Sequence, residues 1–318
     1  ITAEPKQPGE ELNAGSTTVT SKTKTSAGTY LPAGFSEVAG TNLDNGLTIQ
    51  DSKGNQYVWV EVPKTSEVYP TAGLAIKDFT DAEYDDIESD LHDYTRDYRK
   101  DEVEPMSFMK DDKYTGIEAK KLTYIEYNAQ TNIRQMALKE EGWRDEYYSD
   151  AVTGLTSDQY TELKQKMLKS VYQNGGFYVG KYETGIENAP KTSGSADTVP
   201  TETAVIKQNA YPYNNVTCSQ AQTLASNMES GKYTSSLMFG VQWDLVLKYL
   251  ETKGTAQADL NENSTKWGNY NNNLWDIINT DSKYAQNGSG WISGAYGTKT
   301  SNASILLSTG ASDTFCKQ

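Results

Sequence analysis

The sequence predicts a mixed α+β fold. Two runs of β-branched and aromatic residues flank a short turn at residues 51–55, which is typical of a β-hairpin. Several apolar patterns of helical period begin at a capping residue. From residue 255 onward the chain is rich in Asn, Gly, Ser and large rings, which favours loops with short strands. The 318 residues are enough for one large domain or about two ordinary ones.

Residues 1–29 are expected to form a flexible linker. They contain Pro5, Pro8, Gly9 and a Ser/Thr/Lys run that cannot bury enough apolar surface to become ordered. An extracellular stalk and an exposed tail of any protein both fit this composition. The chain opens without an initiator Met, so we expect a mature or trimmed product. No window approaches 18 consecutive apolar residues, and no transmembrane segment is expected.

Residues 30–63 are expected to form the N-terminal β part of the core. The strand patterns at 46–50 and 56–62 are joined by Asp51-Ser52-Lys53-Gly54-Asn55, in which Gly54 can adopt a positive φ. Asp51 and Asn55 also suggest a calcium loop, but Lys53 stands where such a loop needs an oxygen ligand. The segment is therefore predicted to be a turn.

Residues 78–112 form an acidic segment with 14 acidic and 4 basic side chains. One face of a helix is indicated by apolar residues at spacings of 3, 4, 3 and 4, namely Tyr84, Ile87, Leu91, Tyr94 and Tyr98. The acidic residues are expected on the solvated face, with a surface for a cation or a basic partner as the alternative. His92 has no Cys or second His near it in sequence, so we expect it to be structural or exposed.

A second helix is predicted after the capping-box pattern Thr156-x-x-Gln159. Its apolar positions are Tyr160, Leu163, Met167, Leu168 and Val171. The helix is expected to end at Gly175-Gly176. A strand with alternating large and small residues follows directly at 177–183.

Two further helices are predicted in the second half of the chain. The pattern Thr217-x-x-Gln220 begins one that should end before Gly231. The other has Val241, Leu245 and Tyr249 on one line and ends at Gly254. Four more apolar residues are expected to fill the same buried stripe, namely Trp243, Val246, Leu247 and Leu250.

The segment after residue 255 contains five large rings among Asn, Ser and Gly. They are Trp267, Tyr270, Trp275, Trp291 and Tyr296. Such rings can stack on a sugar or peptide while neighbouring amides form hydrogen bonds, and we treat these five as candidate ligand-binding residues. Equally, a loop-rich domain needs rings to build the core beneath its few strands. Both interpretations stay open at this point.

The composition excludes several classes of function. The net charge of −14 repels phosphate backbones, so nucleic acid is not an expected partner. One His and two Cys cannot build a tetrahedral zinc site without carboxylates, and they argue against acid–base enzymes that rely on His. No phosphate-binding Gly-rich loop precedes a helix. We expect no cofactor, although calcium could bind in the loops after 255, where no pattern names its ligands.

Several short motifs recur in an order that resembles the formylglycine-generating-enzyme-like (sulfatase-modifying-factor) branch of the C-type-lectin fold. The closest likeness is to secreted bacterial surface proteins of that branch, many with a pilin-like N-terminal segment. The resemblance covers somewhat over half of the chain. Its motifs are YVWVEVP at 57–63, GGFYVGKYE at 175–183, PYNNVTCSQA at 212–221, SSLMFGVQWD at 235–244, WGNY at 267–270 and STGASD at 308–313.

The resemblance implies an α+β, C-type-lectin-like core with a helical insertion. The expected parts are the linker at 1–29, the β part at 30–63, an acidic helical insertion at 64–174 and the lectin-like core at 175–318. The family's later motifs, an Asn-Val-Trp-Glu-Trp-like run, an Arg-Gly-Gly-Ser strand and a Gly-Phe-Arg strand, are not found before Gln318. We therefore expect that the chain is cut before the fold is complete or that a second piece supplies the rest.

Cys218 and Cys316 are the two cysteines of the chain. In an exported protein their simplest arrangement is a disulfide, which would close a loop of about 100 residues and stabilise by about 4–5 kcal/mol in the chain-entropy model. Two buried free thiols and a redox pair are the alternatives. The catalytic cysteines of the related enzymes lie in the part of the pattern that is not found here, so no catalytic residue is assigned.

These observations lead to an expected function in binding rather than catalysis. We expect an extracellular protein, displayed on the cell surface, that recognises a protein or glycan ligand in adhesion. One alternative is a structural subunit of a pilus or surface fibre, whose partners are other subunits. Another is an enzyme of the formylglycine-generating type that acts on peptide cysteine.

Overall fold

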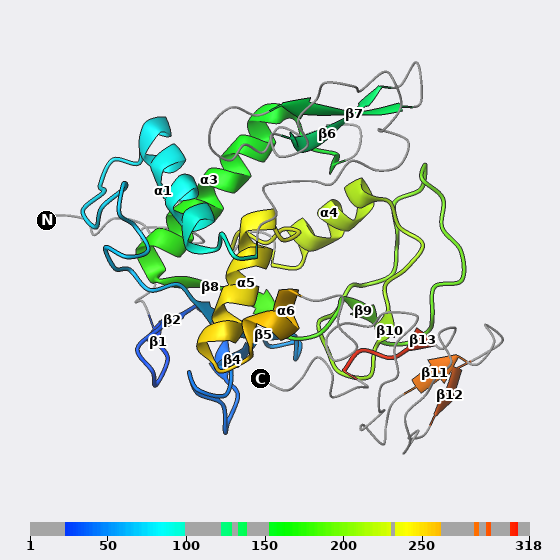
Figure 1. Cartoon of the computed structure of the whole chain (residues 1–318). Coiled ribbons are helices and arrows are strands. Elements are labelled where there is room, and N and C mark those ends of the chain that lie inside the picture. Colours follow the sequence, from blue (N-terminus) through cyan, green and yellow to red (C-terminus); the bar gives the residue numbers. More distant parts are fainter. Residues whose placement is uncertain are drawn as a thin grey trace, which may run out of the picture.

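The computed structural model confirms a mixed α+β fold with antiparallel sheets (Figure 1). It describes residues 23–98, 122–128, 133–138, 153–229, 233–261, 283–285, 291–293 and 306–310. The candidate residues Trp267, Tyr270, Trp275, Tyr296 and Cys316 lie outside these ranges.

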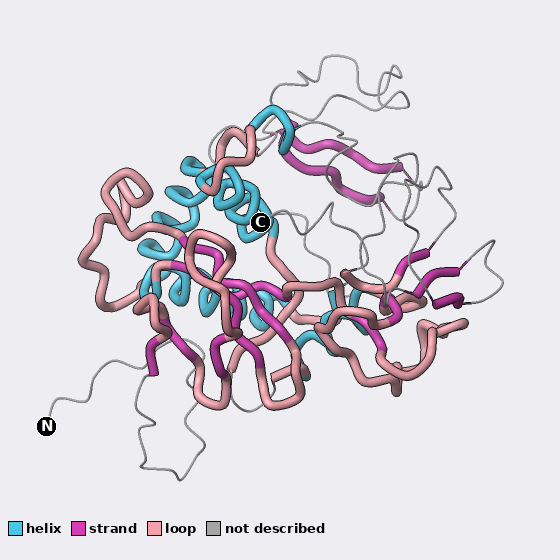
Figure 2. The backbone as a smooth tube through the Cα atoms, turned by 90° about the horizontal axis from the view of Figure 1, so that it is seen from below, coloured by secondary structure: helices cyan, strands magenta, loops and turns pink. Residues whose placement is uncertain are grey.

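A four-stranded antiparallel sheet in the order β3-β4-β5-β8 forms the centre of the fold. Its strands are β3 (Ser36–Glu37), β4 (Thr48–Gln50), β5 (Gln56–Glu61) and β8 (Gly176–Gly180). The predicted hairpin is confirmed as the β4–β5 pair, with Ile49 opposite Tyr57. In Figure 2 the helices lie together on one side of these strands.

The turn between β4 and β5 is held by the side chain of Asp51. Its carboxylate accepts hydrogen bonds from the backbone N–H groups of Lys53 and Asn55, each at 2.8 Å, and from Asn55 Nδ2 at 2.8 Å. Gly54 adopts the positive φ of 86° that the turn requires. The turn interpretation is therefore confirmed, because the oxygens that a calcium ion would need are used by the turn itself.

The pairing of β5 with β8 joins two parts of the chain that are far apart in sequence. Trp59 lies opposite Tyr178, and their rings meet edge to face at 5.0 Å. The Val62 N–H donates to the Gly175 carbonyl at 2.9 Å. The chain therefore leaves the sheet at Val62 and returns to it at Gly175, and all of residues 63–174 lie between these neighbouring points.

The helices that carry predicted caps begin where the sequence indicates. Reciprocal capping boxes start α3 (Ser157–Asn174) and α4 (Cys218–Asn227) at Thr156 and Thr217. A capping box at Thr80, which was not predicted, starts α1 (Asp81–Tyr94). Gly175 ends α3 in the left-handed region. The remaining helices are α5 (Gly240–Thr252) and the short α6 (Gln257–Asn261). Among the described residues no helix is both long and apolar enough to cross a membrane.

A single hydrophobic cluster connects the sheet with α1, α3 and α5, which lie side by side in Figure 1. The cluster draws many of its members from residues 64–174, the segment expected as an insertion. Buried members from that segment are Val68, Tyr69, Phe79, Ile87, Leu91, Met167, Leu168, Val171 and Tyr172. Those from the flanking parts are Val60, Val62, Phe177, Phe239, Val241, Leu245 and Tyr249. The described part of the expected insertion thus shares its core with the sheet.

Two acidic residues of α1 are buried, although the pattern predicts a solvated acidic face. The Asp90 carboxylate accepts hydrogen bonds from the Thr71 and Ala72 N–H groups, the shortest at 2.8 Å. Glu88 forms an ion pair with Lys164 of α3 at 3.0 Å and lies 3.9 Å from His92 Nε2. His92 is 1% exposed, so its role here is structural.

The remaining described strands are short and form small separate antiparallel sheets. β1 (Thr23–Lys24) pairs with β2 (Tyr30–Leu31), so part of the segment expected as a linker forms a strand. Within the expected helical insertion, β6 (Leu122–Asn128) pairs with β7 (Ile133–Leu138). The remaining strands are β9 (Gly185–Ile186), β10 (Tyr211–Pro212), β11 (Lys283–Ala285), β12 (Trp291–Ser293) and β13 (Leu306–Leu307). The last three agree with the short strands predicted after residue 255.

The β5–β8 pairing leads to a test at Gly176. A Cβ atom there would lie 2.3 Å from the Val60 carbonyl oxygen and 2.5 Å from the Trp59 ring, so backbone would have to move. We expect Gly176→Ala to lower the unfolding free energy by about 3 kcal/mol in denaturant titrations. Gly240→Ala is the matched control, because its Cβ would meet nothing within 4 Å. It should raise stability by up to about 1 kcal/mol. Equal effects of the two variants would contradict this account of the pairing.

Candidate functional site

A cleft of about 1230 Å³ opens between the β5–β8 part of the sheet and the helices α3, α4 and α5. This volume is above the usual range of about 300–1,000 Å³ for small-molecule pockets in proteins. Much of its wall is apolar. Lining residues of this kind include Val58, Val179, Met167, Leu224, Ala225, Met228, Trp243, Val246, Leu247 and Leu250.

The α5 helix has two apolar sides, which corrects the prediction of one buried stripe. Successive residues of an α-helix are rotated by about 100°. Val241, Leu245 and Tyr249 therefore point one way and are buried in the core. Trp243 lies on the opposite side, is 57% exposed and lines the cleft. Leu247 and Leu250 line the cleft as well and do not belong to the core cluster, whereas Val246 lines the cleft and also packs against that cluster.

The α4 helix forms another wall of the cleft. Ala221, Leu224, Ala225 and Met228 recur at helical spacing and line it. None of the described members of the main hydrophobic cluster comes from α4. The apolar side of α4 therefore faces the cleft instead of packing into the core.

Polar contacts hold α4 at a distance from the sheet. Gln222 of α4 accepts a hydrogen bond from the Leu237 N–H at 3.2 Å. Just beyond the C-terminal end of α4, Glu229 accepts one from the Tyr57 hydroxyl of β5 at 3.3 Å. Such bonds fix the position of a helix without bringing its apolar side against the sheet, so the cleft stays open between them.

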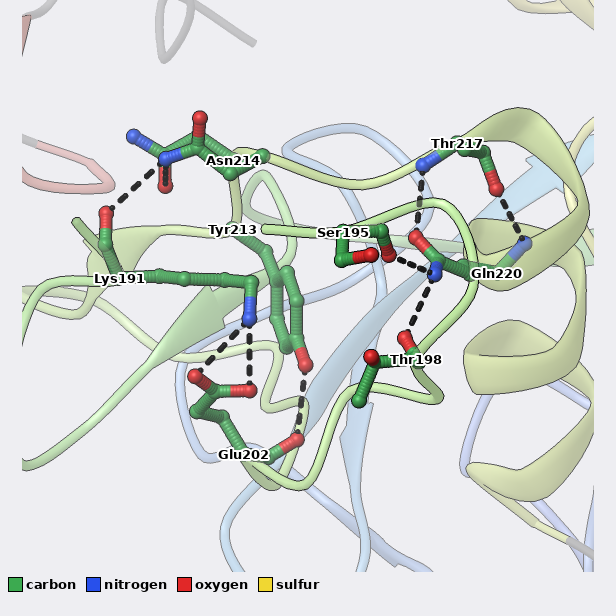
Figure 3. Close-up of polar contacts among 9 residues, drawn as sticks. Lys191, Ser195, Thr198, Glu202, Tyr213, Asn214, Thr217 and Gln220 are labelled. Atoms are coloured by element: carbon green, nitrogen blue, oxygen red, sulfur yellow. Dashed lines mark hydrogen bonds and ion pairs between the residues drawn. The ribbon is translucent and has the colours of Figure 1, made fainter. Parts of the chain in front are cut away.

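Gln220 anchors the N-terminal end of α4 to the preceding loop (Figure 3). Its Oε1 accepts from the Thr217 N–H at 2.9 Å and completes the cap. Its Nε2 donates to the carbonyls of Ser195 at 2.8 Å and Thr198 at 2.7 Å. Gln220 is buried, so one side chain satisfies the helix cap and two loop carbonyls.

The same loop is closed on itself by an ion pair and two hydrogen bonds (Figure 3). Lys191 Nζ lies 3.0 Å from the Glu202 carboxylate. The Tyr213 hydroxyl donates to the Glu202 carbonyl at 2.9 Å, and Asn215 Nδ2 donates to the Lys191 carbonyl at 3.3 Å. Tyr213 also lines the cleft, so this network fixes part of the cleft wall.

Titratable groups gather where α4 meets the β4–β5 turn. Burial, with the nearby charge of Glu229, raises the pKa of Tyr57, so its phenol stays protonated and donates to Glu229. Burial and the charge of Asp51 raise the pKa of Glu229. Burial alone would raise the pKa of Asp51, but hydrogen bonds from Asn55 and Lys53 hold it below its ordinary value.

The described residues give the cleft exposed apolar side chains. They contain no cluster of three or more His, Cys, Asp or Glu that could hold a metal ion. Cys218 is exposed at the first turn of α4. Because Cys316 lies outside the described residues, the disulfide stays a prediction. The same holds for the ligand-binding role of the tail rings, of which Trp291 is described in its β12 backbone.

Trp243 and its exposed neighbours Leu237 and Met238 were not predicted as binding residues. A signal for them was present in the sequence. The apolar positions of α5 span more of the helix than one buried stripe requires, and two opposite apolar sides indicate contact with more than the core.

Comparison with known proteins gives no relative for this chain. No family model matches it, and neither a curated protein nor a solved structure is similar to it. The resemblance to the formylglycine-generating-enzyme-like branch therefore stays a prediction from the motifs.

The double role of Gln220 gives a test of the loop anchor. Gln220→Glu keeps the cap acceptor but removes the two donors to the loop carbonyls. We expect faster amide hydrogen exchange in residues 191–202 and a loss of about 1–3 kcal/mol in unfolding free energy. Gln159→Glu is the control, because Gln159 caps α3 in the same way from an exposed position. Unchanged exchange in the loop of Gln220→Glu would refute the anchor.

The pKa of Glu229 predicts a dependence of stability on pH. Because its pKa is raised in the folded protein, the folded state holds this proton more tightly than the unfolded chain. The unfolding free energy therefore falls as pH rises from the ordinary glutamate value through the raised one. Glu229→Gln should gain stability relative to wild type across this window, measured by denaturant titration from about pH 4 to about pH 7. Parallel curves for the two proteins would contradict the prediction.

Proposed function

We propose that this chain is a binding protein of the extracellular surface, with a C-type-lectin-like core, that recognises a protein or glycan ligand in adhesion. The observation that carries the proposal is the large apolar cleft with Trp243 exposed in its wall. The motif order described above supports the choice of core and the extracellular location.

The exposed residues at the cleft are of the kind that ligands bury. Leu237 and Met238 are exposed like Trp243, and all three line the cleft. Exposed apolar residues that line one cleft are a common mark of a binding site. A tryptophan ring offers a large rigid area for stacking on a sugar or packing on a side chain.

A structural role in a surface fibre is the second candidate. The same three residues could pack against another copy of the chain, since a heterologous contact of this kind propagates into a filament. The two functions differ in their dependence on concentration. A ligand saturates a monomer, whereas a fibre subunit assembles as its own concentration rises.

Trp243→Asp tests the proposal. We expect the full chain to bind saturably on a glycan array or to a display library of nine-residue peptides. The variant should bind at least about tenfold more weakly, because it places a charge in an apolar wall. The exposed position of Trp243 predicts an almost unchanged unfolding free energy.

Val199→Asp is the matched control, because Val199 is 70% exposed and does not line the cleft. It should bind like wild type. Equal binding by wild type and Trp243→Asp would contradict the proposal. Assembly that rises with protein concentration in sedimentation velocity, without a saturable ligand, would favour the fibre subunit.

A further inference from the structure

The strand β8 is an edge of the central sheet. Its pairing partner is β5, and within the described residues no strand pairs with its other side. An unpaired edge presents a row of N–H and C=O groups that another strand can use. What lies beside this edge therefore matters for function.

The register shows which backbone groups of β8 are available. In an antiparallel pair, successive residues point their backbone groups alternately toward the partner strand and away from it. The Lys181 N–H donates to the Gln56 carbonyl and the Gly175 carbonyl accepts from Val62, so residues of odd number face β5. The N–H and C=O groups of Tyr178 and Gly180 consequently point away from the sheet. Within the described part of the chain these groups form no hydrogen bond.

The cleft runs along this edge. Its lining contains every residue of β8, together with side chains from both faces of the sheet. Val179 and Val58 lie opposite each other and share one face, whereas Tyr178 and Trp59 share the other. A cavity lined by residues of both faces extends around the lateral edge of the sheet that β8 forms. It therefore lies beside the backbone groups of β8 that point away from β5.

We propose that β8 binds an extended segment of a partner polypeptide by strand addition. The inference rests on the proposed binding function and narrows its ligand from a protein or glycan to a polypeptide. A polypeptide strand repeats donors and acceptors at the spacing of Tyr178 and Gly180, which a glycan does not. Its alternate side chains meet two different walls. One wall is apolar, with Val179, Met167 and Leu163, and the other holds the Tyr178 and Tyr30 side chains.

The charge of the cleft restricts the partner further. The lining contains three lysines and three acidic residues, namely Lys166, Lys181, Lys253, Asp44, Glu183 and Glu229. This balance differs from the net charge of −14 of the whole chain. A partner segment without net charge fits this balanced lining best. A segment with several charges of one sign would lack enough opposite charges in the cleft to pair with. The partner segment is therefore neutral and extended, with an apolar residue at every second position.

The test uses the full chain and two display libraries of neutral nine-residue peptides. In one library apolar residues alternate with polar ones, and in the other they follow the helical spacing of three and four. We expect binders from the alternating library. Two N-methylated forms of the best peptide are compared, one methylated at its odd-numbered amides and the other at its even-numbered amides. The form whose methyl groups block the amides that face β8 should bind at least about tenfold more weakly, and the other form should lose less than about threefold.

Amide hydrogen exchange of the protein supplies an independent measurement. On binding of the selected peptide, the Tyr178 and Gly180 amides should exchange at least about tenfold more slowly. The Val179 amide, which already faces β5, should change little.

Binders from the helical library alone, or a bound peptide that leaves Tyr178 and Gly180 unprotected, would overturn strand addition. If the Trp243→Asp variant no longer bound that peptide, the proposed binding function would stand although strand addition would not. The absence of binders from both libraries would overturn strand addition. In that case, a glycan that binds wild type and binds Trp243→Asp more weakly would still support the proposed binding function.

Discussion

The pairing of β5 with β8 is the constraint on which the rest of the structure depends. Val62 and Gly175 are hydrogen-bonded neighbours although more than a hundred residues separate them. Bringing such distant segments together carries an entropic penalty that must be offset by what they bury. The offset comes from one face of the pair, where Val60, Val62 and Phe177 join the cluster built by α1, α3 and α5. Gly176 allows the close approach, since any side chain there would meet the Val60 carbonyl and the Trp59 ring.

The same pairing explains why the segment between the two strands is part of the core. Both of its ends are fixed at the sheet, so α1 and α3 fold back over it. Two buried carboxylates of α1 have partners within the same segment. Asp90 accepts from the backbone at Thr71 and Ala72, and Glu88 pairs with Lys164 across the two helices. Each contact joins α1 to another part of the same segment, which orders the segment against the sheet without a separate core.

The α4 helix follows a different principle, and this difference creates the cleft. It is held at both ends by hydrogen bonds, through Gln220 to the loop and through Glu229 to Tyr57, while its apolar side faces the cavity. Directional bonds position a helix without removing its apolar surface from water. The apolar sides of α4 and α5 and the outer edge of β8 then line one space. The proposed polypeptide strand would meet apolar walls together with backbone groups that no described residue pairs, a combination suited to strand addition.

The sequence by itself determined the local elements of this protein. The Asp51–Asn55 turn, the caps at Thr156 and Thr217, and the Val241, Leu245 and Tyr249 line were all predicted, because hydrogen bonds and periodicity within a few residues decide them. It also indicated the α+β class. Only the tertiary structure decided which apolar residues are buried. Trp243 fits a helical apolar pattern as well as Leu245 does, yet Leu245 packs in the core and Trp243 lines the cleft. The burial of Asp90, the double role of Gln220 and the place of β8 at the end of the strand order likewise depend on partners that are distant in sequence. A local pattern carries no information about such partners.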